Sequence, residues 1–308
     1  MAGPLRIGTR GSALALWQAH WVRDLLAEGG AECEIVEITT AGDRGGAAGD
    51  KARWTSELER ALLDGRIDVA VHSAKDVPGE LADGTALAAI PPREDPRDAI
   101  CGAESLAALP AGARVGTSSL RRAAQVRAAR ADLEIVPVSG NVDTRLRKLA
   151  EGQADALVLA LAGLRRLGRE DAAGAILDEL VPAAGQGALA LQTRAGEERT
   201  VAALNDEVAW RCVGAERSLT LALGASCQSA VGVHAVPAEE FVVVAGVGDG
   251  LATPMPLPEV QMRVWVGLPD GSRWITDTLT DSPEMAPVEL AARLESVGAR
   301  ELIAGAAR

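Results

Sequence analysis

The chain has 308 residues, which exceeds one ordinary hydrophobic core and favours two or three domains. Its formal net charge of −12 argues against a dedicated nucleic-acid-binding protein. No run approaches the ~18 apolar residues of a membrane span, and the N-terminus shows no apolar signal-peptide core, so we expect a cytoplasmic protein without membrane contact.

The first 185 residues alternate between predicted strands and helices. Ser12 is a suitable N-cap for a helix whose apolar face includes Leu14, Trp17 and Trp21. Strands are expected within 5–10, 33–42, 67–74 and 84–90, a helix within 56–65, and a Pro-rich linker at 91–98. With one Phe and no Tyr, Ala, Leu and Val must fill the core.

A second round of strands and helices follows this linker. Strands at 113–116 and 133–141 lead into helices at 117–130 and 142–152, and 154–168 combines a strand with a short helix. Segment 180–194 leads out of this round, and its Gly185 and Gly187 permit close backbone turns. Repeated βα units predict parallel or mixed sheets with helices on both faces.

The pattern changes at Asp206. We expect a helix at 208–224, a loop at 225–229, short strands at 230–236, 241–248, 260–268 and 272–280, and a last helix at 286–300. This composition predicts a small α+β C-terminal domain. The fold class is therefore α/β, with two mixed-sheet domains and a third, smaller domain.

Polar motifs follow the predicted strands at corresponding ends. They are Arg10 to Ser12, Thr40 to Arg44, Ser73 to Asp76, Gly116 to Arg122 and Ser139 to Arg145. Ligands of open α/β sheets bind at the carboxyl ends of strands, and helix N-termini there attract anions. The region 114–166 also holds ten basic and five acidic residues. Each motif alone could be a solvated turn or an exposed helix face, but together they predict a site for a small anionic ligand.

Lys75 and Asp76 stand side by side at one of these strand ends, and Lys75 is one of only three lysines. On their own they could be two solvated turn charges. Cys33, Cys101 and Cys212 lie in strand or helix patterns and suit buried small hydrophobic residues, whereas Cys227 lies in an open Gly/Ala/Ser loop. The cysteines show no paired spacing, so reduced thiols are expected. The three histidines form no cluster that suggests a metal site.

Eight strings of the sequence resemble the porphobilinogen deaminase (hydroxymethylbilane synthase) family, in the order seen there and over nearly the whole chain. They are RIGTRGSALALWQA (6–19), HSAKDVP (72–78), REDPRDA (93–99), GTSSLRRAAQ (116–125), GNVDTRL (140–146), LALAGLRRLG (159–168), PAAGQGALALQ (182–192) and ERSLTLALGASCQSAVG (216–232). The resemblance implies two domains like type II periplasmic binding proteins, 1–92 with 188–205 and 93–187, and a C-terminal domain at 206–308. It also implies a monomer.

The implied activity joins four porphobilinogen molecules into hydroxymethylbilane with loss of ammonia, a step of heme and tetrapyrrole biosynthesis. Asp76 would be the catalytic carboxylate that stabilises the azafulvene cation left after ammonia departs. Cys227 would carry the covalent dipyrromethane cofactor. The implied cofactor contacts are Lys75, Ser119, Arg121, Arg122 and Arg145, and the implied substrate contacts are Arg10, Ser12, Gln18, Lys51 and Arg166.

Three departures from the family pattern suggest a divergent copy. Ser139 replaces the usual Arg, the lid segment at 51–54 reads KARW, and the cysteine loop at 225–230 reads ASCQSA. A non-catalytic or weakly active paralogue that binds a small polycarboxylate is therefore a second hypothesis. A third, a Ser–Lys hydrolase built on Ser73 and Lys75, lacks the SxxK spacing and an oxyanion motif. A covalent chromophore on the protein would distinguish the first two.

Overall fold

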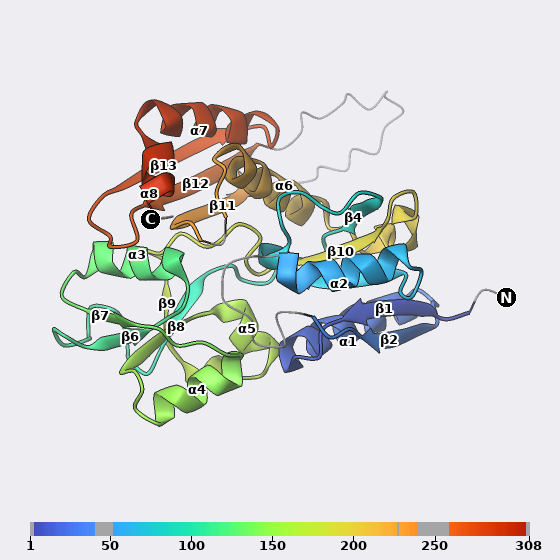
Figure 1. The fold of residues 1–308 in the computed structure, drawn as a ribbon, viewed down its shortest axis with the longest axis horizontal. Helices are drawn as coiled ribbons and strands as arrows, with labels where there is room; N and C mark the ends of the chain where they lie inside the picture. The colour runs from blue at the N-terminus through green and yellow to red at the C-terminus, as the bar shows by residue number, and fades with distance from the viewer. Residues whose placement is uncertain (1–2, 41–51, 227, 239–258, 306–308) are drawn as a thin grey trace, which may run out of the picture.

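The computed structural model describes residues 3–40, 52–226, 228–238 and 259–305. Within them the chain forms two five-stranded mixed sheets and one three-stranded antiparallel sheet. Figure 1 shows the first sheet at the right, the second at the lower left, and the C-terminal unit above both. The predicted class, two mixed α/β sheets followed by a small α+β unit, is confirmed.

The first sheet has the strand order β2-β1-β3-β10-β4. Its strands are β1 (Leu5–Thr9), β2 (Cys33–Glu37), β3 (Val69–Ser73), β4 (Thr85–Ala89) and β10 (Leu189–Arg194). β1 runs parallel to β2 and β3, whereas β10 lies antiparallel between β3 and β4. Val69 and Val71 pack with helix α1 (Ala13–Glu28), and Ala70 packs with α2 (Ala52–Leu63). Because successive strand residues face opposite sides, the two helices cover opposite faces.

The second sheet repeats this arrangement, with the order β7-β6-β8-β5-β9. Its elements are β5 (Asp98–Cys101), β6 (Arg114–Gly116), α3 (Leu120–Ala129), β7 (Glu134–Val136), α4 (Val142–Ala150), β8 (Ala156–Ala160), α5 (Leu161–Arg166) and β9 (Ala173–Leu177). β6 is parallel to its two neighbours, and β5 is antiparallel to β8 and β9. Strands β5 and β9 were not predicted, because β5 is a four-residue strand at the end of the linker and β9 is rich in Ala and Gly.

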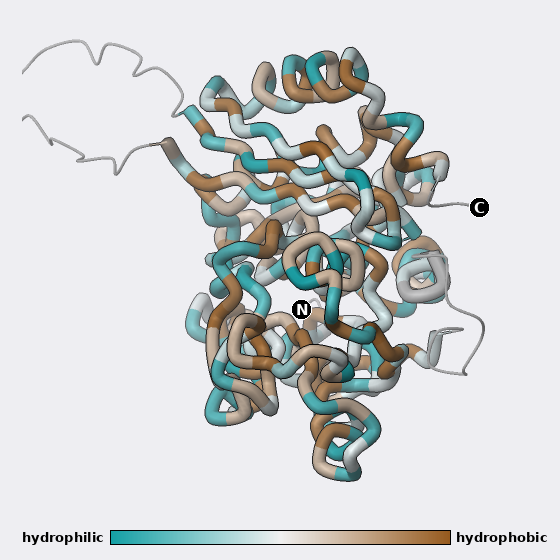
Figure 2. The backbone as a smooth tube through the Cα atoms, turned by 90° about the vertical axis from the view of Figure 1, so that its left-hand side faces the viewer, coloured by the Kyte–Doolittle hydropathy of each residue, from teal (hydrophilic) through white to brown (hydrophobic). Residues whose placement is uncertain are grey.

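The C-terminal unit packs helices on one sheet. Its elements are α6 (Glu207–Ala222), β11 (Val231–Pro237), β12 (Val260–Gly267), β13 (Trp274–Asp281), α7 (Met285–Ser296) and α8 (Ala299–Gly305). Figure 2 shows this unit at the top, with hydrophilic and hydrophobic residues interspersed along its strands. Along β13, exposed residues alternate with partly buried ones. The single helix predicted at 286–300 is wrong, because Gly298 has a φ of +89° and separates α7 from α8. The predicted strand 241–248 lies outside the described residues.

Aliphatic side chains form the cores, as expected from the scarcity of aromatic residues. The largest fully buried side chains are all Leu or Ile. Separate clusters lie on each face of the first sheet, on each face of the second, and under the C-terminal sheet. Within the described ranges, no helix has the length and apolarity needed to cross a bilayer.

Two chain connections link the α/β sheets and lie side by side. The linker between β4 and β5 contacts the segment before β10, with Arg93 Nε donating to the Gln186 carbonyl at 2.9 Å. The backbone N of Glu94 donates to the carbonyl of Gly187 at 3.3 Å. We propose three domains, 1–92 with 188–205, 93–187 and 206–308, because each sheet draws its strands from one of these ranges.

Candidate active site

A short 3-10 turn, Ala74–Asp76, follows β3 and carries Lys75 and Asp76. Ala74 is buried, and its N donates to the carbonyl of Ala188 at 3.0 Å. A Cβ at Gly185 would lie 2.9 Å from the carbonyl carbon of Ala74, and Gly185 has a φ of +73°. Both the space and the backbone conformation therefore require glycine there. The loop around Gly185 fixes the position of the Lys75–Asp76 turn.

Lys75 is half-buried beside charges from both α/β sheets. Burial, followed by the positive charge of Arg122, lowers the pKa of Lys75 to about 8, and Asp76 and Asp98 act in the opposite direction. Among the described residues, no carboxylate lies within ion-pair distance of the Lys75 ammonium. Its charge can therefore meet a carboxylate of a ligand.

A small cavity adjoins Asp76. Its polar lining residues are Arg10, Gln18, Thr55, His72, Ser73 and Asp76. Gln18 is buried on α1, and its Nε2 lies 3.0 Å from Ser73 Oγ, which ties α1 to the end of β3. Two predicted substrate contacts, Arg10 and Gln18, are thus brought together with Asp76. Ser12 caps α1 by accepting a hydrogen bond from the N of Ala15 at 3.3 Å and does not line this cavity.

Arg121 and Arg122 lie on α3 and share one buried carboxylate. Arg121 Nη2 lies 2.7 Å from Asp98 Oδ2, and Arg122 Nη2 lies 2.8 Å from Asp98 Oδ1. The Asp98 side chain is 0% exposed. Burial alone would raise the pKa of Asp98, but the two guanidinium groups hold it well below its usual range. These arginines therefore already have a counter-charge within the protein.

Gln186 completes this buried group. Its Nε2 donates to Asp98 Oδ1 at 2.8 Å, and its Oε1 accepts from Arg122 Nη2 at 3.3 Å. Sequence reasoning missed both Asp98 and Gln186 as parts of the site, although both lie within the recognised strings. The signal was electrostatic, since two adjacent arginines that pack inward need a nearby carboxylate.

Arg145 and Arg166 are half-buried and have backbone partners instead. Arg145 Nε donates to the carbonyl of Gly140 at 2.8 Å, and Arg166 Nη2 donates to that of Gly187 at 2.7 Å. Burial lowers the pKa of each guanidinium to about 10. Arg166 also stacks over Trp17 of α1 at 6.0 Å from the ring centroid. Among the described residues, no carboxylate forms a salt bridge with either arginine.

Ser119 and Ser139 differ in their roles. Ser119 caps α3, and its Oγ accepts from the N of Arg122 at 3.4 Å. Ser139 is exposed, and its carbonyl accepts from Lys148 Nζ at 3.1 Å. Asp143, near Ser139 in sequence, is paired with Arg169 at 3.0 Å.

Two predicted site residues, Lys51 and Cys227, lie outside the described residues. The other three cysteines are unpaired. Burial raises the pKa of Cys101 and of Cys212 to about 11, and it also raises the pKa of Cys33. These thiols are poor nucleophiles at neutral pH, because the thiolate is the reactive form.

Glu216 on α6 is a further buried carboxylate that sequence reasoning missed. It binds Arg93 of the linker, with Nη1 to Oε1 at 2.8 Å, and its side chain is 0% exposed. Its oxygens also accept from the N of Gly185 at 2.6 Å and of Ala235 at 2.8 Å. One side chain thus joins the linker, the loop behind Lys75, and the C-terminal sheet.

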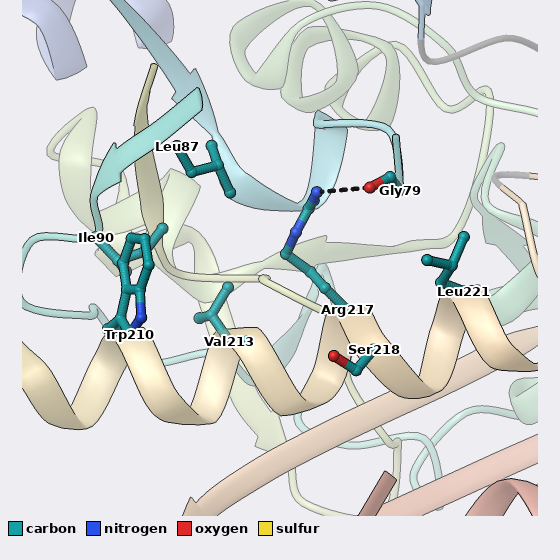
Figure 3. Close-up of a pocket in the computed structure, with 9 residues that line it drawn as sticks. Gly79, Leu87, Ile90, Trp210, Val213, Arg217, Ser218 and Leu221 are labelled. Carbon is teal, nitrogen blue, oxygen red and sulfur yellow. Dashed lines mark hydrogen bonds between the residues drawn. The ribbon is translucent and has the colours of Figure 1, made fainter. Parts of the chain in front are cut away.

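An apolar groove of about 250 Å³ lies between α6 and the segment that follows Asp76, as Figure 3 shows. Arg217 crosses it and donates to the carbonyls of Val77 at 3.2 Å, Pro78 at 2.7 Å and Gly79 at 3.3 Å. The groove shares no lining residue with the cavity at Asp76. Arg217 therefore connects α6 to the segment that directly follows Asp76.

Comparisons with known proteins show which family the chain resembles. A family model described as "Porphobilinogen deaminase, dipyromethane cofactor binding domain" matches residues 5–202. The porphobilinogen deaminases of Thiobacillus denitrificans and Mycobacterium leprae are 43% and 44% identical, over 97% and 98% of this chain and 97% of each relative. That of Roseiflexus sp. is 50% identical over 76% of this chain and 82% of the relative. Among solved structures, a periplasmic substrate-binding protein of an ABC transporter from Coxiella burnetii matches with a TM-score of 0.41 and 14% identity, over 67% of this chain and 93% of that chain.

Proposed function

The chain belongs to the porphobilinogen deaminase family, and we propose that it joins four porphobilinogen molecules head to tail into hydroxymethylbilane, releasing ammonia at each step. The reaction is primed by a covalently attached dipyrromethane. The single observation that carries the assignment of the chemistry to this chain is the position of Asp76. Its side chain lines a cavity at a strand end, with Arg10 and Gln18 in the same wall.

Asp76 stabilises the positive charge that develops on the substrate. Loss of ammonia from an aminomethylpyrrole leaves an electron-poor cation, and a fixed carboxylate lowers the energy of that cation through the pyrrole N–H. The turn that holds Asp76 is backed by Gly185, so the carboxylate needs little reorganisation when the charge forms. Ser73 and Gln18, hydrogen-bonded to each other beside it, help to orient the substrate.

Cations around the site bind the carboxylates of substrate and cofactor. Every pyrrole ring of substrate and cofactor carries an acetate and a propionate, so the protein needs cations that its own carboxylates do not neutralise. Lys75, Arg145 and Arg166 meet this requirement, because burial disfavours their charge and no described salt bridge offsets that cost. The remaining proposed contacts are Arg10, Ser12, Gln18, Lys51 and Ser119.

Arg121 and Arg122 fit cofactor binding in a different way. Asp98 neutralises one of their two charges, which leaves a net positive group at the N-terminus of α3. Arg121 Nε is buried without a hydrogen-bond partner among the described residues. This donor set suits an anionic group with more than one oxygen, and a dipyrromethane carries four carboxylates.

Cys227 is the proposed attachment point. The bound dipyrromethane supplies the pyrrole carbon to which the first porphobilinogen is joined. Cys101 and Cys212 are buried thiols with a raised pKa and are unsuited to attach the cofactor. This supports an attachment point in the loop at 225–229. In that loop the N of Ser226 donates to Ser229 Oγ at 3.0 Å.

Intact mass and peptide mapping of protein from porphobilinogen-producing cells test this assignment. We expect one dipyrromethane adduct on Cys227, absent in Cys227→Ser, and bilane formation only by the loaded protein. Unmodified wild-type protein that consumes no porphobilinogen would favour a non-catalytic polycarboxylate-binding paralogue.

We also propose a cytoplasmic monomer. Unpaired Cys33, Cys101 and Cys212 suit a reducing compartment. Light scattering of the loaded protein measures its oligomeric state directly.

A further inference from the structure

The cavity beside Asp76 is small enough to select its occupant by size. Its volume is about 30 Å³. A cavity needs roughly 10–15 Å³ to hold a water molecule, so this one has room for about two molecules of that size, and a pyrrole ring can lie only at its mouth. The molecule inside is therefore smaller than a pyrrole ring, while the substrate ring lies at the mouth beside Asp76.

Thr55 supplies an unpaired polar group in this cavity. Its side chain is on α2 and is 1% exposed. Among the described residues its Oγ1 has no hydrogen-bond partner. An unpaired buried hydroxyl is unfavourable, so a small polar molecule that binds it would relieve that cost.

His72 supplies a hydrogen-bond acceptor, and a chain of contacts fixes its tautomer. Glu59 Oε1 accepts a hydrogen bond from Gln192 Nε2 at 3.0 Å, so the amide NH₂ of Gln192 faces Glu59. Gln192 Oε1 then faces His72 Nε2 at 3.0 Å, and this nitrogen must donate. Burial lowers the pKa of His72 to about 4, so the ring is neutral and Nδ1 keeps a lone pair.

We propose that this cavity holds the ammonia molecule released from porphobilinogen, between Thr55, His72 and Asp76. Ammonia has three N–H donors and one lone pair. The lining offers acceptors in His72, Ser73 and Asp76, and Thr55 both donates and accepts. Ammonium fits less well, because it has no lone pair to accept a hydrogen bond from the Thr55 hydroxyl, and the charges of Arg10 and Asp76 in the wall offset each other.

This inference rests on the proposed function. When the C–N bond of the protonated aminomethyl group breaks, the electron pair stays with nitrogen and neutral ammonia departs. The positive charge stays on the substrate beside Asp76. Ammonia held in the cavity remains next to the carbon it has left and can add back to it.

The test uses the full, cofactor-loaded chain turning over porphobilinogen with increasing ammonium chloride at fixed pH and ionic strength. Mass spectrometry measures the share of bilane that ends in an aminomethyl instead of a hydroxymethyl group. For wild type we expect this share to follow a saturation curve. Thr55→Val should raise the half-saturating concentration about three- to tenfold, through loss of one hydrogen bond.

Thr55→Ser keeps the hydroxyl and should keep the wild-type half-saturation, even if Thr55→Val folds poorly. Thr220→Val is the matched control, because Thr220 also lies in a helix and its Oγ1 donates to the Glu216 carbonyl, outside the cavity. A linear rise of the aminomethyl share with ammonia in wild type would show that ammonia is trapped directly from solution. Equal curves for Thr55→Val and Thr55→Ser would show that the cavity holds only water. Either result would overturn the proposal. Total bilane reports on the proposed function separately, so its loss in wild type would overturn both.

Discussion

The two α/β sheets each bring a carboxylate and several cations to the carboxyl ends of their parallel strands. In the second sheet the carboxylate is Asp98, which pairs across the sheet with Ala160 at the end of β8 and is held by Arg121 and Arg122. In the first sheet it is Asp76, which follows β3, and no described hydrogen bond or salt bridge engages it. Both sites contain a carboxylate near cations, but Asp98 already pairs with arginines of the protein, whereas Asp76 faces a cavity.

The difference shows how to separate structural from functional charge in this fold. A buried carboxylate whose hydrogen bonds are already made, like Asp98, fixes the position of its neighbours, and its removal destabilises the fold by leaving their buried charges uncompensated. A carboxylate with unused acceptor capacity beside unneutralised cations is available for chemistry. Changes at the two aspartates should therefore affect different measurements.

The largest effect is expected for Asp98→Asn, on stability. The change leaves two buried guanidinium groups without a counter-charge, which typically costs about 3–5 kcal/mol of unfolding free energy. Urea unfolding followed by circular dichroism measures this. Asp178→Asn is the matched control, since Asp178 is 74% exposed and its pair with Arg97 should contribute less than about 1 kcal/mol. Equal unfolding midpoints for the two variants would contradict the structural role of Asp98.

Asp76→Asn should lower turnover on the order of 100-fold or more, because it removes one preorganised charge and keeps the shape of the side chain. Its unfolding midpoint should match wild type. The measurement is steady-state bilane formation by cofactor-loaded protein. A variant that keeps most of its wild-type rate would mean that another group stabilises the substrate cation.

Ser139→Arg sharpens the comparison by adding a cation on the side of the second sheet. A hydrogen bond to a charged group contributes roughly 1.5–3 kcal/mol, or about 10- to 150-fold in affinity or rate. We expect faster elongation or a lower KM, provided that Asp143 stays with Arg169, its partner at 3.0 Å. The double variant with Asp143→Gly removes that competition. If neither variant gains activity while folded and loaded, a missing carboxylate clamp at Ser139 does not limit the enzyme.

The smallest effect concerns Lys75 and pH. With a pKa of about 8, Lys75 is charged below that pH and neutral above it, so kcat/KM should fall as pH rises, by about tenfold at most by pH 9. Lys75→Arg keeps its charge and should move this fall to higher pH. The contribution of Lys75 to stability has the opposite trend. Its pKa in the folded protein lies below the ordinary lysine value of 10.5, so the unfolded chain binds more protons between about pH 8 and 10.5, and the stability of the fold rises with pH over that range. If kcat/KM of wild type and of Lys75→Arg depends on pH in the same way, Lys75 does not bind a substrate carboxylate.

Local sequence patterns were enough to place the residues of the first sheet. Arg10 and Asp76 each follow a strand that the sequence indicates clearly, Gln18 lies on the helix after the first of these strands, and the three residues meet in one cavity. The partner of Arg121 and Arg122 could not be predicted in this way. It depends on β5 inserting antiparallel between β8 and β9, a non-local pairing that no periodicity in a four-residue strand reveals. The role of Glu216 could not be predicted either, because its partners are distant in sequence and it resembles an ordinary polar residue of a helix.

Arg217 has a mechanical consequence. Its contacts with the carbonyls of 77–79, together with the Asp206 N to Ile90 carbonyl bond at 2.8 Å, join α6 to the first sheet at two points along the helix. A helix held at two points moves together with the sheet, so the C-terminal end of α6 at Ala222 keeps its distance from Asp76. With the attachment point that we propose at Cys227, a product that lengthens by one ring per cycle is not accommodated by movement of α6 away from the carboxylate. We therefore expect the growing chain to fold back, or the second sheet to move outward about the paired connections at 91–97 and 185–188.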